Sequence, residues 1–223
     1  MNDADLDLLV DQYVKKRKAF SGFLSNVTDF FLEDNDALKD ANGRSAIHSI
    51  KSRLKDPDHL RQKIVRKSQK GIHIDATNLF SVITDFCGAR VMHLRRSDFS
   101  IIHSAILSHA SDQNWYFAED PKAYTWDPEY KLYFDGLSLA SEIKESFYTS
   151  VHYLVRPNPE SSVICEIQVR SLFEEIWGEV DHDLNYPEAT KIKSCSEQLK
   201  VLAKLVGAGS RLVDSIYSSA SDD

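Results

Sequence analysis

Three polar side chains that could work together alternate with apolar residues in one stretch of the sequence. Residues 163–170 read VICEIQVR, so Glu166, Gln168 and Arg170 fall on one face of an extended segment and the apolar residues on the other. A carboxylate, an amide and a guanidinium in a row can line a polar pocket. The same alternation also fits a half-exposed strand with an ordinary polar face.

A second group of chemically capable residues is cationic. Between Arg44 and Lys70 the sequence carries nine Lys or Arg residues and two acids, a local balance of +7 in a chain of net charge −7. Such a patch suits a polyphosphate, because Arg offers a planar fork of donors and Lys a mobile point charge. Taken alone, the patch also fits a solvated helix face.

Four segments, taken in order, resemble the synthetase domain of the RelA/SpoT family. They are SRLKDP at 52–57, DFCGARV at 85–91, YTSVH at 148–152, and EIQVR at 166–170 with the WGEVDHDLNY that follows. Enzymes of that family move a pyrophosphate from ATP to a ribose 3′-hydroxyl, usually of GDP or GTP, and so make the alarmones (p)ppGpp. The resemblance covers roughly residues 44–187.

The resemblance implies a site for the pyrophosphate donor. Arg53, Lys55 and Lys63 would hold the phosphates of ATP, with Arg66 beside them. Arg90, the arginine of the DFCGARV segment, would face the nucleotide.

The resemblance also implies a catalytic pair, Asp85 and Glu166. An aspartate just before a strand is more often a cap or turn residue, but in the family motif it binds Mg²⁺. This cation takes one or two carboxylates and completes its coordination with water and phosphate oxygens, so the two acids would suit it. Glu166 is in addition the candidate base for the attacking hydroxyl.

The implied acceptor site consists of Tyr148, Ser150, His152, Gln168 and Arg170. Tyr148 would stack on the guanine base, while His152 and Gln168 would position the acceptor. The sequence departs from the family here in two ways. The run Lys-Asp-Tyr-Ile-x-x-Pro-Lys found upstream in many alarmone synthetases is not recognisable, and Phe147 stands where a small residue is usual.

Three functions remain open. The favoured one is a stand-alone pyrophosphokinase, a transferase that uses ATP and Mg²⁺ to convert GDP or GTP to (p)ppGpp. The second is a toxic relative that pyrophosphorylates the 3′ end of tRNA, which the altered acceptor segment and the basic runs at 15–18 and 95–96 favour. Such a toxin could have a neutralising partner protein. The third is an inactive nucleotide-sensing domain, against which the retained carboxylates and cations argue.

Hydrophobic periodicity predicts the elements that must position these residues. Apolar residues at helical spacing predict helices over 4–33, from Pro57 onward, over 97–109 and over 194–218. Alternation predicts strands over 46–55 and 163–170, the second followed almost at once by a helix.

Caps and isolated polar residues add detail to this pattern. Asp56 and Ser97 are expected to cap the two middle helices, and His103 and His109 are expected to be polar surface residues. The aromatic residues of 112–140 fit either the packing of short strands or stacking on nucleobases.

The implied fold is α+β: a nucleotidyltransferase-like mixed sheet flanked by helices, with extra helices at both ends. We divide the chain into an N-terminal helical segment (1–43), a synthetase-like domain (44–190) and a C-terminal helix with its tail (191–223). The last helix would either cover the domain or mediate self-association into a homo-oligomer.

Composition indicates a soluble globular protein. The 223 residues are 42% hydrophobic and 27% charged, and no apolar run approaches the length of a bilayer span. The acidic N-terminus does not resemble a signal peptide. Three widely spaced cysteines do not form a disulfide or zinc pattern, so a reducing, cytoplasmic location without membrane contact is expected.

Overall fold

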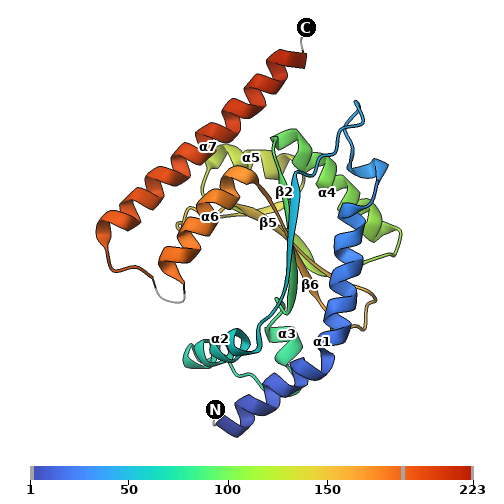
Figure 1. The fold of residues 1–223 in the computed structure, drawn as a ribbon, viewed down its shortest axis with the longest axis vertical. Coiled ribbons are helices and arrows are strands. Elements are labelled where there is room, and N and C mark those ends of the chain that lie inside the picture. The colour runs from blue at the N-terminus through green and yellow to red at the C-terminus, as the bar shows by residue number, and fades with distance from the viewer. Residues whose placement is uncertain (1–2, 187–188, 222–223) are drawn as a thin grey trace.

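The computed structural model describes residues 3–186 and 189–221, and a mixed six-stranded sheet forms its centre (Figure 1). The strands are β1 (Ser49–Leu54), β2 (Cys87–His93), β3 (Tyr116–Thr125), β4 (Ala140–Ile143), β5 (Ser150–Arg156) and β6 (Cys165–Ser171). Their order across the sheet is β1-β2-β6-β5-β3-β4. The pairs β2–β6 and β3–β4 are parallel, and the other neighbours are antiparallel.

Helices flank this sheet on both sides. They are α1 (Asp3–Leu32), the 3₁₀ turn η1 (Asp36–Leu38), α2 (Pro57–Gln69), α3 (Leu79–Val82), α4 (Arg96–Ser111), α5 (Pro128–Gly136), α6 (Leu172–Asn185) and α7 (Lys193–Ser221). In Figure 1, α1 and α4 lie on one side of the sheet, and α6 lies on the other with α7 packed outside it. This arrangement confirms the predicted α+β class. None of the described helices has the length and apolar content that a membrane crossing needs.

The face of the sheet under α1 forms the main hydrophobic core. Tyr13 and Phe20 of α1 are fully buried and pack against Phe86, which directly precedes β2. The Tyr13 hydroxyl also donates a hydrogen bond of 2.6 Å to the carbonyl of Lys55. The core therefore fixes the end of β1, where the predicted cations lie.

The aromatic region is largely packing. Trp115, Tyr130 and Phe134 are buried, and β3, α5 and β4 occupy most of this stretch. The N–H of Trp115 donates to Asn26 of α1 at 3.0 Å. Of the two predicted roles for the aromatic residues, packing therefore accounts for these three.

The sheet passes into α6 without a loop. Ser171 ends β6 and is also the N-cap of α6, and Glu174 accepts the Ser171 backbone N–H at 3.0 Å. The Ser171 hydroxyl in turn accepts the Glu174 N–H at 3.2 Å. This reciprocal capping box starts the helix at once, as the sequence predicts, and directs α6 back over the sheet.

Two local predictions are wrong. The N-cap of α4 is Arg95 rather than Ser97, because the Asp98 carboxylate accepts the Arg95 backbone N–H at 2.9 Å and so begins the helix two residues earlier. His103 is buried rather than a surface residue, and its Nδ1 lies 2.8 Å from the hydroxyl of Tyr153. A buried imidazole needs such a partner, which only the packing of α4 on β5 provides.

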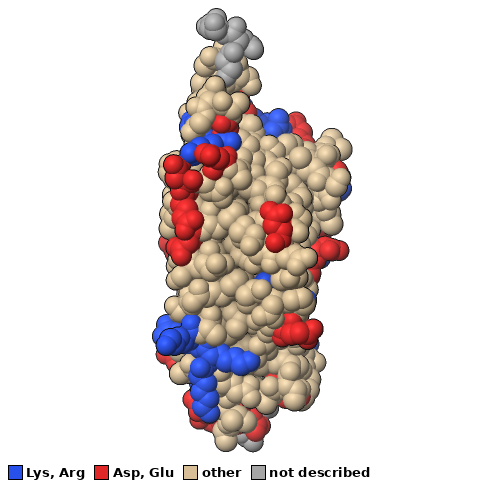
Figure 2. Space-filling view, turned by 90° about the vertical axis from the view of Figure 1, so that its right-hand side faces the viewer, with Lys and Arg blue, Asp and Glu red and all other residues tan. Residues whose placement is uncertain are grey.

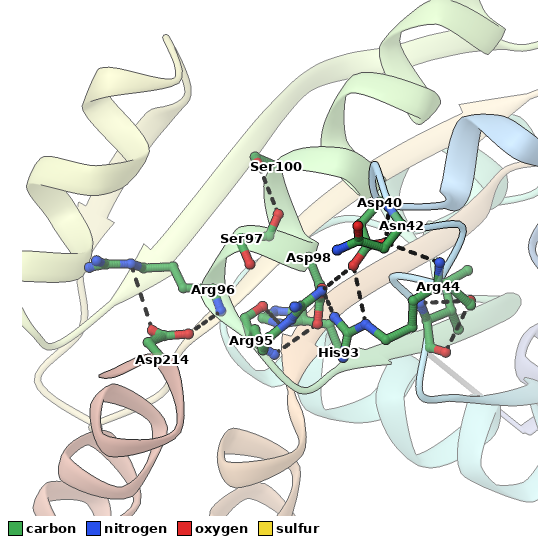
Figure 3. Close-up of polar contacts among 12 residues, drawn as sticks. Asp40, Asn42, Arg44, His93, Arg95, Arg96, Ser97, Asp98, Ser100 and Asp214 are labelled. Atoms are coloured by element: carbon green, nitrogen blue, oxygen red, sulfur yellow. Dashed lines mark hydrogen bonds and ion pairs between the residues drawn. The ribbon is translucent and has the colours of Figure 1, made fainter. Parts of the chain in front are cut away.

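The same region contains a network of charges that ties distant segments together (Figure 3). Arg95 contacts Asp98 at 2.6 Å and Asp40 at 2.9 Å, so the chain before β1 is joined to the start of α4. The backbone N–H of Arg96 donates to Asp214 of α7 at 2.7 Å. Both arginines of the 95–96 run are thus engaged in contacts within the fold.

Helix α7 packs closely on α6 through a second, smaller hydrophobic cluster. Trp177 of α6 and Ala203 and Val206 of α7 are buried there. Gly209 permits the close approach, since a Cβ at this position would lie 2.7 Å from Cε1 of Phe173. The sequence places a glycine in the middle of α7 at a cost in helix propensity, and this contact is the reason.

We predict opposite stability changes for two glycine-to-alanine substitutions in long helices. Gly209→Ala should lower the free energy of unfolding by about 1–3 kcal/mol, because the new Cβ overlaps the Phe173 ring. Gly22→Ala is the control: nothing lies within 4 Å of its Cβ position in α1, so better helix propensity should raise stability by about 1 kcal/mol. Denaturant unfolding of both variants measures the difference, and a stabilised Gly209→Ala protein would contradict the packing described here.

Candidate active site

A cavity of about 300 Å³ lies between the sheet and α6. Its walls come from three neighbouring strands, β1, β2 and β6, and from the helix. The polar lining residues are Lys51, Ser52, Arg53, Arg90, Glu166, Gln168, Glu179 and His182.

The parallel pairing of β2 with β6 brings two distant segments together at this cavity. Glu166 is in register with Gly88, and Gln168 with Arg90. Asp85 lies two residues before β2, and its charge acts on the Glu166 carboxylate. The approach favours a small residue on β2, since a Cβ at Gly88 would lie 3.2 Å from the Glu166 carbonyl oxygen, closer than ordinary van der Waals contact.

Two lysines hold the carboxylate of Asp85. Lys55, at the end of β1, donates to Oδ2 at 2.8 Å, and Lys63 of α2 contacts Oδ1 at 2.8 Å. Burial disfavours the charged carboxylate, but the charges of Lys63 and Lys55 outweigh it and lower the pKa of Asp85 to about 2. Asp56 caps α2 as predicted, by accepting the backbone N–H of Asp58 at 2.9 Å.

A continuous chain of polar contacts surrounds Glu166. The Tyr148 hydroxyl lies 2.9 Å from Nε2 of His152, whose Nδ1 lies 3.1 Å from Oε1 of Glu166. Gln168 donates to Oε2 of Glu166 at 2.9 Å and accepts from Arg170 at 2.7 Å. Burial works against ionisation of Glu166, yet the contacts with His152 and Gln168 leave its pKa below the ordinary value.

Acidic residues of α6 pair with cations of the sheet, a feature that our reading of the sequence missed. Glu175 contacts Lys51 at 2.8 Å and Arg90 at 3.3 Å, and Glu179 contacts Arg90 at 2.7 Å. The two acids are four residues apart, so they lie on one face of the helix. That spacing is the signal that could have identified them.

A second missed residue is Gly178, in the middle of α6. A Cβ there would lie 2.6 Å from Nη1 of Arg170, so the glycine leaves room for the guanidinium. Arg170 is buried, and its guanidinium carbon lies 5.5 Å from the centre of the Tyr148 ring. A glycine inside a helix lowers stability by about 1 kcal/mol relative to alanine. The presence of a glycine in a predicted helix was therefore the signal in the sequence for a close contact at this position.

The structure does not bring all the predicted site residues to the cavity lining. Arg53 lines the cavity and forms no ion pair with any described residue. Arg66 instead contacts the Tyr186 hydroxyl at 3.2 Å. Ser150 is buried, and its hydroxyl donates to the Val169 carbonyl across the sheet at 3.4 Å.

The donor set at Asp85 and Glu166 fits Mg²⁺. Within the described ranges, no group of three or more His, Cys, Asp or Glu is arranged to hold a metal ion. Mg²⁺ ordinarily binds one or two carboxylates and keeps water and phosphate as its remaining ligands. Each carboxylate oxygen has two lone pairs, so the contacts with lysine, His152 and Gln168 leave acceptor capacity for a cation.

We predict a pH-dependent stability contribution from Asp85. Its pKa falls from 3.8 to about 2 on folding, so the contribution is fully present above about pH 4 and is lost as the pH falls through about 2. The shift corresponds to roughly 2 kcal/mol. The difference in unfolding free energy between wild type and Asp85→Asn, measured from pH 7 to pH 2, should therefore shrink below pH 4; a constant difference would contradict the ion pairing.

Comparison with known proteins identifies the family of this chain. The family model described as a region found in RelA / SpoT proteins matches residues 52–191. A search of curated protein sequences finds no match.

Several solved structures have the same fold. Small alarmone synthetase 1 from Bacillus subtilis is 19% identical, with a TM-score of 0.67 over 94% of this chain and 96% of that one. Its structure bound to the product pppGpp is 21% identical, with a TM-score of 0.64 over 91% and 93% of the two chains. A GTP pyrophosphokinase family protein from Streptococcus pneumoniae is 18% identical, with a TM-score of 0.65 over 100% and 97%.

These likenesses show that the sheet and its helices adopt the small alarmone synthetase fold. Because the family model matches more than half of the sequence, this protein belongs to the RelA/SpoT family.

Proposed function

We propose that the protein is a pyrophosphokinase that transfers the β,γ-pyrophosphate of ATP to the ribose 3′-hydroxyl of GDP or GTP. The 3′-oxygen bonds to the β-phosphorus, the bond from that phosphorus to the α–β bridging oxygen breaks, and AMP leaves. The observation that carries the proposal is the pairing of β2 with β6, which sets Glu166 beside the segment of Asp85. The carboxylate of Asp85 is in turn held by two lysines. Two ionised carboxylates beside a cationic group are what phosphoryl transfer with Mg²⁺ requires.

The donor would lie against the cations at the end of β1. Lys55 and Lys63 are held at Asp85, where they can contact phosphate oxygens, and Arg53 offers a guanidinium without an ion pair in the described chain. Arg90 is paired with Glu179, so nucleotide binding there would have to share or exchange that partner. Preformed cations stabilise the charge that develops on the transferred group.

Asp85 and Glu166 would hold Mg²⁺, which when bound supplies positive charge to the phosphate oxygens. Glu166 is the base in this proposal: its lowered pKa keeps it ionised at neutral pH, and it accepts the proton of the attacking 3′-hydroxyl. His152 and Gln168 fix the two carboxylate oxygens of Glu166 in place.

The acceptor would bind beside Tyr148 and His152. Phe147 has a φ of 64°, a backbone conformation that favours glycine, and its ring packs 5.1 Å from that of Trp126. Packing in the cluster under α7 offsets the strain and holds the next residue, Tyr148, at the site.

A guanine nucleotide is the acceptor we favour over tRNA. The arginines of the 95–96 run, which supported a tRNA acceptor, make ion pairs within the fold. One structurally similar protein is described as bound to its product pppGpp. The net charge of −7 is also unfavourable for a long polyanion.

One experiment decides between the acceptors. The protein is incubated with Mg²⁺ and γ-labelled ATP, together with GDP, GTP or deacylated tRNA, and the labelled product is identified. We expect label in the guanine nucleotide. Label in tRNA would support the toxic relative instead, and no transfer to any acceptor would support the nucleotide-sensing domain.

We predict that Glu166→Gln abolishes transfer while the protein stays folded. The amide keeps the size of the side chain but can neither bind the cation as an anion nor accept the proton, so the rate should fall by about a hundredfold or more. Glu160→Gln, an exposed change in the loop before β6, is the matched control and should leave the rate unchanged. Substantial activity in Glu166→Gln would remove this residue from the mechanism.

A further inference from the structure

A second polar pocket lies outside the candidate active site. It has a volume of about 540 Å³, and its walls come from α1, α3, the end of β5 and the loop that leads to β6. None of its lining residues lines the first cavity. Its volume falls within the range of about 300–1,000 Å³ that is usual for small-molecule sites.

The lining of this pocket is cationic in an acidic protein. Lys15, Lys16 and Arg156 line it, and no Asp or Glu does, although the chain carries a net charge of −7. Hydroxyl groups stand beside these cations, from Thr77, Ser81, Ser161 and Ser162. Cations and hydroxyls are the side-chain groups that ordinarily contact phosphate oxygens.

Two buried polar atoms of the lining residues lack partners in the described part of the chain. They are Nε of Arg156, a donor, and Oε1 of Gln12, an acceptor. A buried donor or acceptor without a partner costs free energy, so native structures ordinarily satisfy such groups. Both atoms belong to residues that line the pocket, so the described fold does not by itself satisfy the polar groups of this wall.

The lysines of the basic run at 15–18 differ in whether they line this pocket. Lys16 donates to the Ser162 hydroxyl at 2.8 Å, and its Nζ lies 4.5 Å from the centre of the Phe80 ring, so the lysine is fixed at the pocket wall. Lys15 is exposed and forms no ion pair with a described residue. Lys18 does not line the pocket. Figure 2 shows Lys and Arg side chains gathered low on the face along which α1 runs.

We infer that this pocket is a second anion site, which binds the phosphate group of a nucleotide-sized ligand through Lys15, Lys16 and Arg156. Phe80 and Ile164 provide an apolar wall against which the remainder of such a ligand would lie. The inference does not depend on the proposed function, because it uses none of the residues assigned to pyrophosphate transfer.

The test is an amide NMR titration of the full chain with inorganic pyrophosphate, and in a second arm with GTP. We expect saturable shifts at residues 12–16, 76–81 and 161–164, fitted separately from those of the cations around Asp85. Lys15→Glu and Arg156→Gln should each raise the dissociation constant at the pocket by about tenfold or more, because each removes a charge-assisted contact. Neither should alter the constant fitted at Asp85.

Lys18→Glu is the matched control, since it makes the same charge change on the same helix outside the pocket. It should leave binding nearly unchanged. Shifts confined to the active-site cations, or equal weakening by Lys18→Glu and Lys15→Glu, would overturn the inference. Lys15 is exposed, so its variant decides the question even if Arg156→Gln fails to fold.

Tighter binding of GTP than of pyrophosphate would identify a nucleoside phosphate as the ligand; equal binding would identify phosphate alone.

Discussion

The carboxylates of Asp85 and Glu166 carry like charges and lie near one another at the end of the parallel pair β2–β6. The surrounding side chains keep both carboxylates ionised. Burial and mutual repulsion each raise the pKa of Glu166, yet its pKa is lowered, as is that of Asp85. Lys55, which follows β1, and Lys63 of α2 stabilise one carboxylate, while His152 of β5 and Gln168 of β6 stabilise the other. The side chains that stabilise the ionised forms of these two carboxylates thus come from four parts of the fold.

The direct passage from β6 into α6 is the second constraint. Because Ser171 both ends the strand and caps the helix, no loop separates Glu166 from the helix that covers it. Glu175 and Glu179 therefore reach back to Lys51 and Arg90, and Gly178 leaves room for Arg170. The positive charges on this face of the sheet are thus paired with acidic residues of α6, the helix that directly follows β6.

Cations in this acidic chain differ in what they do, although their sequence context is similar. Arg95 and Arg96 are engaged with acids that fasten α4 to neighbouring segments (Figure 3). Lys55 and Lys63 are held by Asp85 at the candidate active site. Arg53 and Lys15 have no ion pair within the described chain, and both line cavities. Arg53 and Lys15 could therefore bind a ligand without giving up an acidic partner, whereas Lys55 and Lys63 would share Asp85 with it.

By itself the sequence determined the family, the α+β class, the strand carrying Glu166, Gln168 and Arg170, and the helix that follows. Local periodicity and capping are properties of short segments, so they can be read without the fold. Tertiary structure alone decided which residues meet: that His152 contacts Glu166, that His103 is buried against Tyr153, and that Arg66 turns to Tyr186. Such contacts depend on the strand order and on the packing of α6 and α7, and no spacing along the chain encodes either.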